Sequence, residues 1–205
     1  MRRGVALALA ATVVLVGIAA AFGLGLGGLR LTFGPVSFSP MPSLLAGPGL
    51  GQPTSLADAR QAVTFPLRVP GLTEIGDPDL VYLADPPAGG AVTLLYGERD
   101  GFPSDSTTGI GLIVTQFRAD IGPEVFEKLI DSGVRVTRAS VHGHAAWWVA
   151  RGRHFFFYRD ANGAPVESTL RLAGDTLIWE EGGVTHRVEG APSLADALRV
   201  AESLE

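Results

Sequence analysis

The sequence predicts an α+β domain: a curved antiparallel β-meander of about eight or nine strands with helices at both ends and one inserted, preceded by a transmembrane helix. Three observations predict this class. Short apolar segments alternate with turn signals along most of the chain, their connections are only a few residues long, and an uncharged run opens the sequence. Short connections favour antiparallel neighbours, because a parallel return needs a dozen residues or more.

Residues 1–30 are predicted to anchor the chain in the cytoplasmic membrane as a single pass. Gly4–Leu29 contains no charged residue, and Gly4–Phe22 alone would span roughly 28 Å as a helix, about one hydrocarbon core. The two arginines ahead of this run should stay inside the cell, which places the C-terminal domain outside. A secretory signal cleaved near Ala19-Ala20-Ala21 is the alternative, and the protein would then be secreted.

Residues 31–53 are predicted to form a Pro/Gly-rich linker, and residues 54–205 the extracytoplasmic domain. Helices are expected near both ends of this domain, where Ser55 and Ser193 each open the pentapeptide Ser-Leu-Ala-Asp-Ala. Each serine can cap its helix, and the aspartate three residues later can accept a hydrogen bond from the serine's own backbone N–H. The inserted helix is predicted from Pro123 to Ser132, because proline suits a first helical turn and the following glycine suits a helix end.

Between the terminal helices the chain is predicted to be mostly strands. The segments are rich in β-branched and aromatic residues, and Gly, Pro and Asn turn signals separate most of them. The predicted strands are Asp79–Ala84, Ala91–Gly97, Gly109–Phe117, Val134–Val141, Ala145–Ala150, Arg153–Arg159, Val166–Leu172, Thr176–Glu180 and Val184–Val188.

The charge balance argues against nucleic acid as a partner. Three of the 16 basic residues lie at or before residue 30 and all 21 acidic residues lie after it, so the outer part carries 13 basic and 21 acidic residues, a net charge of −8. A surface with this balance repels nucleic acid and anionic lipid. The absence of Cys excludes disulfides, Cys-ligated zinc and thiol catalysis.

Two neighbouring segments concentrate aromatic side chains and are predicted to pair as one hairpin with two apolar faces. Side chains alternate across a strand, so consecutive aromatic residues point to opposite sides. In water these side chains would forgo about 1.5–3 kcal/mol each, so each face needs a cover. The cover is either the core of a curled sheet, or an apolar ligand or partner protein. The aromatic residues that define this candidate surface are Trp147, Trp148, Phe155, Phe156, Phe157 and Tyr158.

His142-Gly143-His144 offers the only local spacing that suggests a metal site. A strand would place His142 and His144 on one side, as a divalent metal requires. Gly143 marks a hairpin turn, which would separate the two rings, so turn residues are the preferred interpretation. The sequence contains no nucleophile elbow and no phosphate-binding glycine loop, and neither a catalytic residue nor a cofactor is predicted.

From Ala62 onward the order of several short motifs resembles a bacterial domain family of unknown function, often found as the outer C-terminal part of anti-sigma-factor-like membrane proteins. The resemblance implies a sensory or regulatory outer domain without known catalytic residues. Only Met1-Arg2-Arg3 precede the predicted anchor, so direct binding of a sigma factor is not expected. The motifs are Ala62-Val-Thr-Phe-Pro-Leu-Arg-Val-Pro, Pro78-Asp-Leu-Val-Tyr-Leu, Leu112-Ile-Val-Thr-Gln-Phe, Gly143-His-Ala-Ala-Trp-Trp, Gly152-Arg-His, Tyr158-Arg-Asp-Ala-Asn-Gly, Leu177-Ile-Trp-Glu and Thr185-His-Arg-Val-Glu-Gly.

The function expected from these features is non-enzymatic: a membrane-anchored outer domain that binds an envelope or membrane protein or senses envelope conditions. A carrier-like curved sheet that binds lipid or lipoprotein acyl chains is the alternative, based on the aromatic segments. A metal-dependent enzyme, based on the four histidines, is a weaker one.

Overall fold

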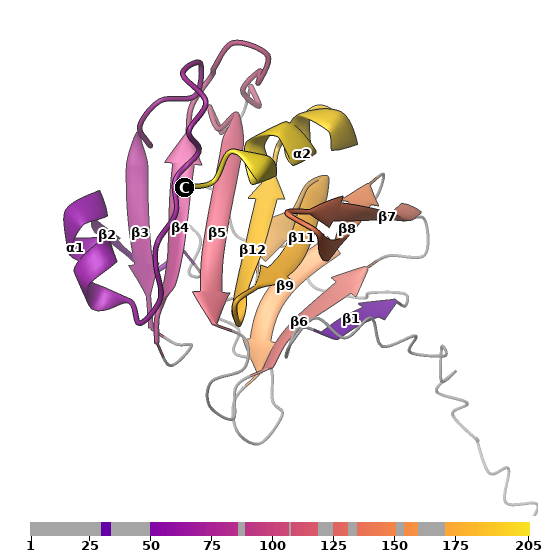
Figure 1. The fold of residues 1–205 in the computed structure, drawn as a ribbon, viewed down its shortest axis with the longest axis horizontal. Helices are drawn as coiled ribbons and strands as arrows, with labels where there is room; N and C mark the ends of the chain where they lie inside the picture. Colours follow the sequence, from indigo (N-terminus) through magenta and orange to yellow (C-terminus); the bar gives the residue numbers. More distant parts are fainter. Residues whose placement is uncertain are drawn as a thin grey trace, which may run out of the picture.

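Two β-sheets and two helices make up the described part of the chain (Figure 1). The structure is a computed structural model that describes residues 30–33, 50–85, 89–106, 108–118, 125–130, 135–150, 154–159 and 171–205. The helices are α1 (Leu56–Ala62) and α2 (Leu194–Glu202). The strands are β1 (Arg30–Phe33), β2 (Gln52–Thr54), β3 (Leu80–Ala84), β4 (Ala91–Tyr96), β5 (Leu112–Arg118), β6 (Val125–Ile130), β7 (Arg135–Val141), β8 (His144–Ala150), β9 (His154–Arg159), β10 (Arg171–Ala173), β11 (Thr176–Glu181) and β12 (Val184–Glu189).

The larger sheet has eight antiparallel strands in the order β2-β3-β4-β5-β12-β11-β8-β7. Together with the two helices it confirms the predicted α+β class. The order is not a simple meander, because β5 is followed in space by β12 and not by the next strand of the chain. Strands β1, β6, β9 and β10 form a second sheet, in which β1 pairs with β6 in parallel.

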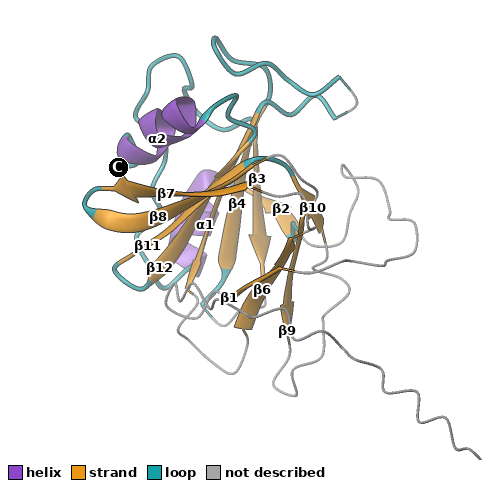
Figure 2. Ribbon diagram, turned by 90° about the vertical axis from the view of Figure 1, so that its right-hand side faces the viewer, coloured by secondary structure: helices purple, strands orange, loops and turns teal. Residues whose placement is uncertain are grey.

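The two faces of the eight-stranded sheet differ in what they bury. We call the side that bears Leu94, Val114 and Trp148 the helical face, because these residues form one core with buried residues of α1 and α2. The other side, which we call the polar face, bears Thr93 and Arg187. Figure 2 shows α2 on one side of the sheet and strands β1, β6 and β9 on the other.

Both predicted helix starts are confirmed, and in both the serine hydroxyl caps the helix as predicted, but the aspartate carboxylate bonds to that hydroxyl and not to the backbone N–H of the serine. The Ser55 hydroxyl accepts from the Asp58 backbone N–H at 3.0 Å, and Ser193 accepts from Asp196 at 3.2 Å. In each case the serine hydroxyl also donates to the aspartate carboxylate. The cap therefore satisfies a backbone donor that the first helical turn would otherwise leave unpaired.

The predicted inserted helix at Pro123–Ser132 is wrong, because Val125–Ile130 forms strand β6. This strand pairs with β9 on one side and with β1 on the other. The sequence Val-Phe-Glu-Lys-Leu-Ile is compatible with either structure, and pairing with distant segments outweighs the local helix signals.

The predicted pairing of the two aromatic segments is also wrong. Strand β8 pairs with β7 and β11 in the larger sheet, whereas β9 pairs with β6 and β10 in the smaller one. The chain thus changes sheet between Ala150 and His154. A short connection permits an antiparallel hairpin but does not enforce one when another strand can pair at the same edge.

Strand β12, Val-Thr-His-Arg-Val-Glu, is rich in polar residues, and yet it is buried along its whole length. Even Arg187 is fully buried and Glu189 nearly so. The reason is the position of β12 between β5 and β11 at the centre of a sheet whose two faces are both covered.

Within the part of the chain that the structure describes, no helix is long and apolar enough to cross a membrane. The predicted anchor at residues 4–29 and most of the predicted linker, residues 34–49, lie outside the described residues. Strands β1 and β2 lie at the two ends of that linker.

Candidate functional site

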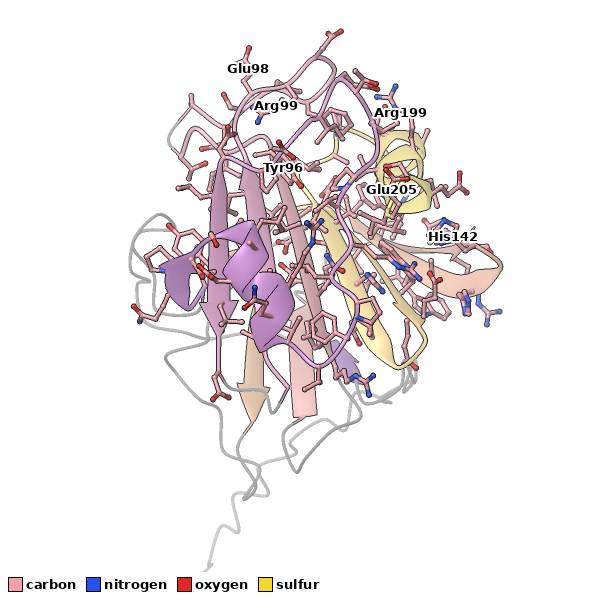
Figure 3. All side chains as sticks on the ribbon, turned by 60° about the vertical axis from the view of Figure 1, so that its left-hand side comes forward. Tyr96, Glu98, Arg99, His142, Arg199 and Glu205 are labelled. Carbon is pink, nitrogen blue, oxygen red and sulfur yellow. The ribbon has the colours of Figure 1, made fainter. Side chains whose placement is uncertain are left out.

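The β7–β8 hairpin, Arg135–Ala150, forms one edge of the eight-stranded sheet. His142 and Gly143 form its turn with φ values of 49° and 83°, the positive angles that a two-residue type I′ turn requires. The prediction of a turn at Gly143 is confirmed. Figure 3 shows the hairpin projecting from the body of the domain, with His142 close to the end of α2.

The hairpin is basic in an otherwise acidic domain. Residues 132–159 contain no Asp or Glu, although the sequence after residue 30 holds all 21 acidic residues. On β7 itself Arg135 and Arg138 are both exposed, as are Thr137 and Ser140 between and after them. Charge and exposure therefore coincide on this edge of the sheet.

Trp147 and Trp148 point to opposite faces of the sheet, as predicted. Trp148 is 6% exposed and lies in the core on the helical face. Trp147 is half-buried, and the guanidinium carbon of Arg138 lies 4.9 Å from the centre of its ring. This cation–π contact holds the Arg138 charge in place on the polar face of the hairpin.

The four remaining residues of the predicted aromatic surface, Phe155, Phe156, Phe157 and Tyr158, lie on β9. Their backbone pairs with β6, and their side chains lie outside what the structure describes. The six aromatic residues therefore do not form one hairpin, and only Trp147 is both described and partly open to solvent.

An ion-pair cluster lies at the turn of the hairpin. The Glu181 carboxylate lies at the end of β11. One of its oxygens is 2.9 Å from Nη2 of Arg68, and the other is 3.1 Å from Nδ1 of His142. The other ring nitrogen, Nε2, lies 3.1 Å from the backbone oxygen of Glu202 in α2. Four separate segments of the chain thus meet at one carboxylate and one imidazole.

The electrostatics of this cluster favour its charged form. The hydrogen bond from Arg68, supported by His142, lowers the pKa of Glu181 to about 2. The hydrogen bond with Glu181 and the Glu202 carbonyl raise the pKa of His142. The contacts of Glu181 and His142 therefore link β11, the hairpin turn and α2.

His186 is packed beside this cluster as a neutral ring. It stacks on Trp179 with the ring centres 5.0 Å apart and the planes 13° from parallel. Burial, supported by the positive charge of Arg68, lowers the pKa of His186 to about 4. Gln116, opposite His186 in β5, accepts from the Arg68 backbone N–H at 3.0 Å and donates to its carbonyl at 2.7 Å.

The structure does not bring His142 and His144 together as a metal site. His142 contacts Glu181, whereas His144 lies beyond the turn, exposed at the start of β8. Among the described residues no group of three or more His, Asp or Glu side chains is arranged to hold a metal ion.

The polar face of the sheet contains a buried ion pair. Arg187 Nη2 lies 2.7 Å from a carboxylate oxygen of Glu189, and the two side chains are 0% and 4% exposed. Thr115 is the register partner of Arg187, and its hydroxyl lies 3.4 Å from that of Thr93 on the next strand. The centre of this face is therefore polar, although it is covered.

A shallow hollow of about 500 Å³ lies in the loop that follows β4, lined by Glu98, Arg99, Asp100, Gly101 and Pro103. Arg99 pairs with the Asp79 carboxylate at 2.9 Å and donates to the Ile75 carbonyl at 2.8 Å. Its guanidinium also lies over the Tyr96 ring, 5.9 Å from the ring centre, as the labelled residues in Figure 3 indicate. These contacts give Arg99 the role of a cross-link between loops.

Comparison of the chain with protein-family models, with curated proteins and with solved structures gives no match. The resemblance to an outer domain of anti-sigma-factor-like proteins therefore stays a prediction.

The basic edge of β7 and the Arg68–Glu181–His142 cluster were both missed from the sequence. The edge had a signal: the stretch 132–159 lacks acidic residues in a strongly acidic domain. The cluster as a unit had none, because its members come from three separate segments, and nothing in the sequence pairs His142 or Arg68 with Glu181.

Proposed function

We propose that this chain is a membrane-anchored extracytoplasmic domain that binds an envelope or membrane protein, with a sensory or regulatory role, and that the β7–β8 hairpin is its binding surface. The observation that carries the proposal is the exposed basic edge of β7, with Trp147 half-exposed beneath Arg138, in a domain whose sequence is otherwise rich in acidic residues. Aromatic and arginine side chains are enriched where proteins bind one another.

The ionisable groups near the hairpin support binding over catalysis. Glu181, Arg68 and His142 bond to one another and to backbone, and His186 is buried in its neutral form. A catalytic acid or base needs a proton that it can exchange with a substrate within hydrogen-bond reach. The contacts of these groups instead hold segments of the fold together.

The uncharged run Gly4–Leu29 supports the membrane anchor, and the arginines before it support an outer location for the domain. The resemblance to outer domains of anti-sigma-factor-like proteins supports a regulatory role. A domain anchored in this way would meet partners that are themselves in the envelope.

The acyl-chain carrier has less support. An apolar ligand held between the two sheets would lie against the polar face, where Arg187, Glu189, Thr93 and Thr115 are buried. Hydrocarbon cannot satisfy buried hydroxyls or charges. Native mass spectrometry of the full chain, released from detergent, tests this alternative: a retained lipid-sized adduct would favour the carrier.

Site-directed photo-cross-linking in living bacteria tests the proposed function. A photoreactive amino acid is placed at Ser140, exposed on the hairpin, and as a matched control at Gln61, exposed on α1. We expect a discrete cross-linked envelope protein from position 140 and none from position 61. Absence of any discrete product from position 140, or the same product from both positions, would contradict the proposal.

A further inference from the structure

Strand β7 has one free edge within the part of the structure that is described. It is the last strand of the eight-stranded sheet, and among the described strands it pairs with β8 alone. The tight turn makes Val141 and His144 a hydrogen-bonded pair, and antiparallel pairs alternate along a hairpin. The backbone N–H and C=O groups of Val136, Arg138 and Ser140 therefore point away from β8, toward the free edge.

A free edge of this kind is a template for one more strand. The N–H and C=O groups of three alternate residues can accept an extended segment without any change in the sheet. Arg138 and Ser140 are exposed, and Val136 is half-buried, so an added strand has access to the backbone there.

The charges on β7 indicate which kind of segment can pair with its free edge. Arg135 lies on the helical face and Arg138 on the polar face, as their register partners Ala150 and Trp147 show. A second copy of β7 would bring arginines opposite arginines, which is destabilising. An acidic segment would instead place opposite charges beside both.

We propose that β7 pairs with an extended acidic segment of a partner protein, which joins the sheet as a ninth strand. The proposal rests on the protein-binding function stated above and names its mode. Because Arg135 and Arg138 are three residues apart on opposite faces, the matching segment carries acidic residues at i and i+3 within a run that favours the β-conformation. The Arg138 side chain is already held over Trp147, so little of its freedom is lost on pairing.

Amide hydrogen exchange on the full chain in detergent micelles tests the pairing. The probe is the blocked peptide acetyl-Thr-Asp-Thr-Val-Asp-Val-Thr-amide, and the control is the same peptide with both Asp residues replaced by Lys. We expect the Asp peptide to slow exchange at Val136, Arg138 and Ser140, whose amides face the free edge. Exchange at Thr137 and Ala139, already paired with β8, should change little. No slowing at the three outward amides, or equal slowing by the Lys peptide, would overturn the proposal.

Two variants make the test specific. Ser140→Pro removes one outward N–H and no bond to β8, so it should abolish protection, whereas Ser140→Ala should retain it. Arg138→Glu should weaken binding of the Asp peptide about tenfold, because it replaces an attraction by a repulsion, and should favour the Lys peptide instead. Unchanged preference for the Asp peptide in Arg138→Glu would overturn the proposal even if Ser140→Pro failed to fold.

The outcomes separate this inference from the function on which it rests. Cross-links from position 140 without protection of the three amides would leave a binding surface that does not pair as a strand. Loss of the cross-links themselves would remove the proposed function.

Discussion

Replacing Glu181 by glutamine tests whether one carboxylate holds β11, the hairpin turn and the Arg68 segment together. Arg68 and His142 lie 2.9 and 3.1 Å from its oxygens and hold its pKa at about 2, against 4.5 for a free glutamate. Fully realised, that difference corresponds to about 3 kcal/mol at neutral pH. The side chains of Glu181 and Arg68 are 18% and 31% exposed, so solvent screening leaves about half of this free energy. We expect Glu181→Gln to lower the free energy of unfolding by about 1.5 kcal/mol.

The effect should depend on pH in both directions. The pKa of Glu181 is lower in the folded chain, so its charge stabilises the fold above pH 4.5 and ceases to do so as the pH falls toward 2. The pKa of His142 is raised, so its positive charge stabilises the fold below pH 6.5 and is lost as the pH rises through the folded value. The difference in the free energy of unfolding between the wild type and Glu181→Gln should be largest at about pH 5.5.

Thermal unfolding of the full chain, followed by circular dichroism at pH 3, 5.5 and 8, measures this difference. About 1.5 kcal/mol corresponds to a melting temperature lower by about 3–6 °C in a domain of this size. Glu202→Gln is the matched control, because Glu202 is exposed and contributes only its backbone oxygen to His142. It should leave the melting temperature unchanged. The reasoning is refuted if Glu181→Gln lowers the melting temperature equally at all three pH values.

Three other tests by substitution probe the packing. Trp148→Ala should destabilise the domain by about 3–5 kcal/mol in chemical denaturation, whereas Trp147→Ala should cost about 1 kcal/mol; similar losses would contradict their placement on opposite faces. Arg187→Met alone should cost about 3–5 kcal/mol because it leaves the Glu189 charge buried, and adding Glu189→Met should recover more than half; a double variant worse than the single one would exclude this explanation. Gly190→Ala should cost about 1–3 kcal/mol by the same measurement, since φ is 90° and an added Cβ would collide with the Gly111 carbonyl; an unchanged stability would show that the turn can shift.

Local signals in the sequence predicted most elements and their ends. The serine caps fixed the starts of both helices, and glycine turns such as His142-Gly143 and Gly182-Gly183 separated strands that do pair as hairpins. Such features depend on residues a few positions apart, so the sequence displays them directly.

What depends on distant segments could not be predicted. Val125–Ile130 is a strand because β1 and β9 pair with it on its two sides. Strand β8 does not pair with β9 because β11 occupies that edge of β8. The same holds for the candidate site. His142 was recognised as a turn residue, but its partner Glu181 and the exposed edge of β7 follow from the order of strands in the sheet.

The position of β12 has a consequence for how the domain is made. Among the described strands of this sheet, β2–β5 on one side and β11, β8 and β7 on the other meet only through β12, which follows all of them in the sequence. A nascent chain that ends before Val184 therefore presents the open edges of two incomplete sheets, at β5 and at β11. Such edges pair readily with other chains. The edge of β11 closes through a local hairpin, whereas the edge of β5 closes only through a contact that is distant in sequence and slow to form. A chain clipped or stalled at this point should aggregate although it retains every other described strand, because β12 shields two strands that were synthesised before it.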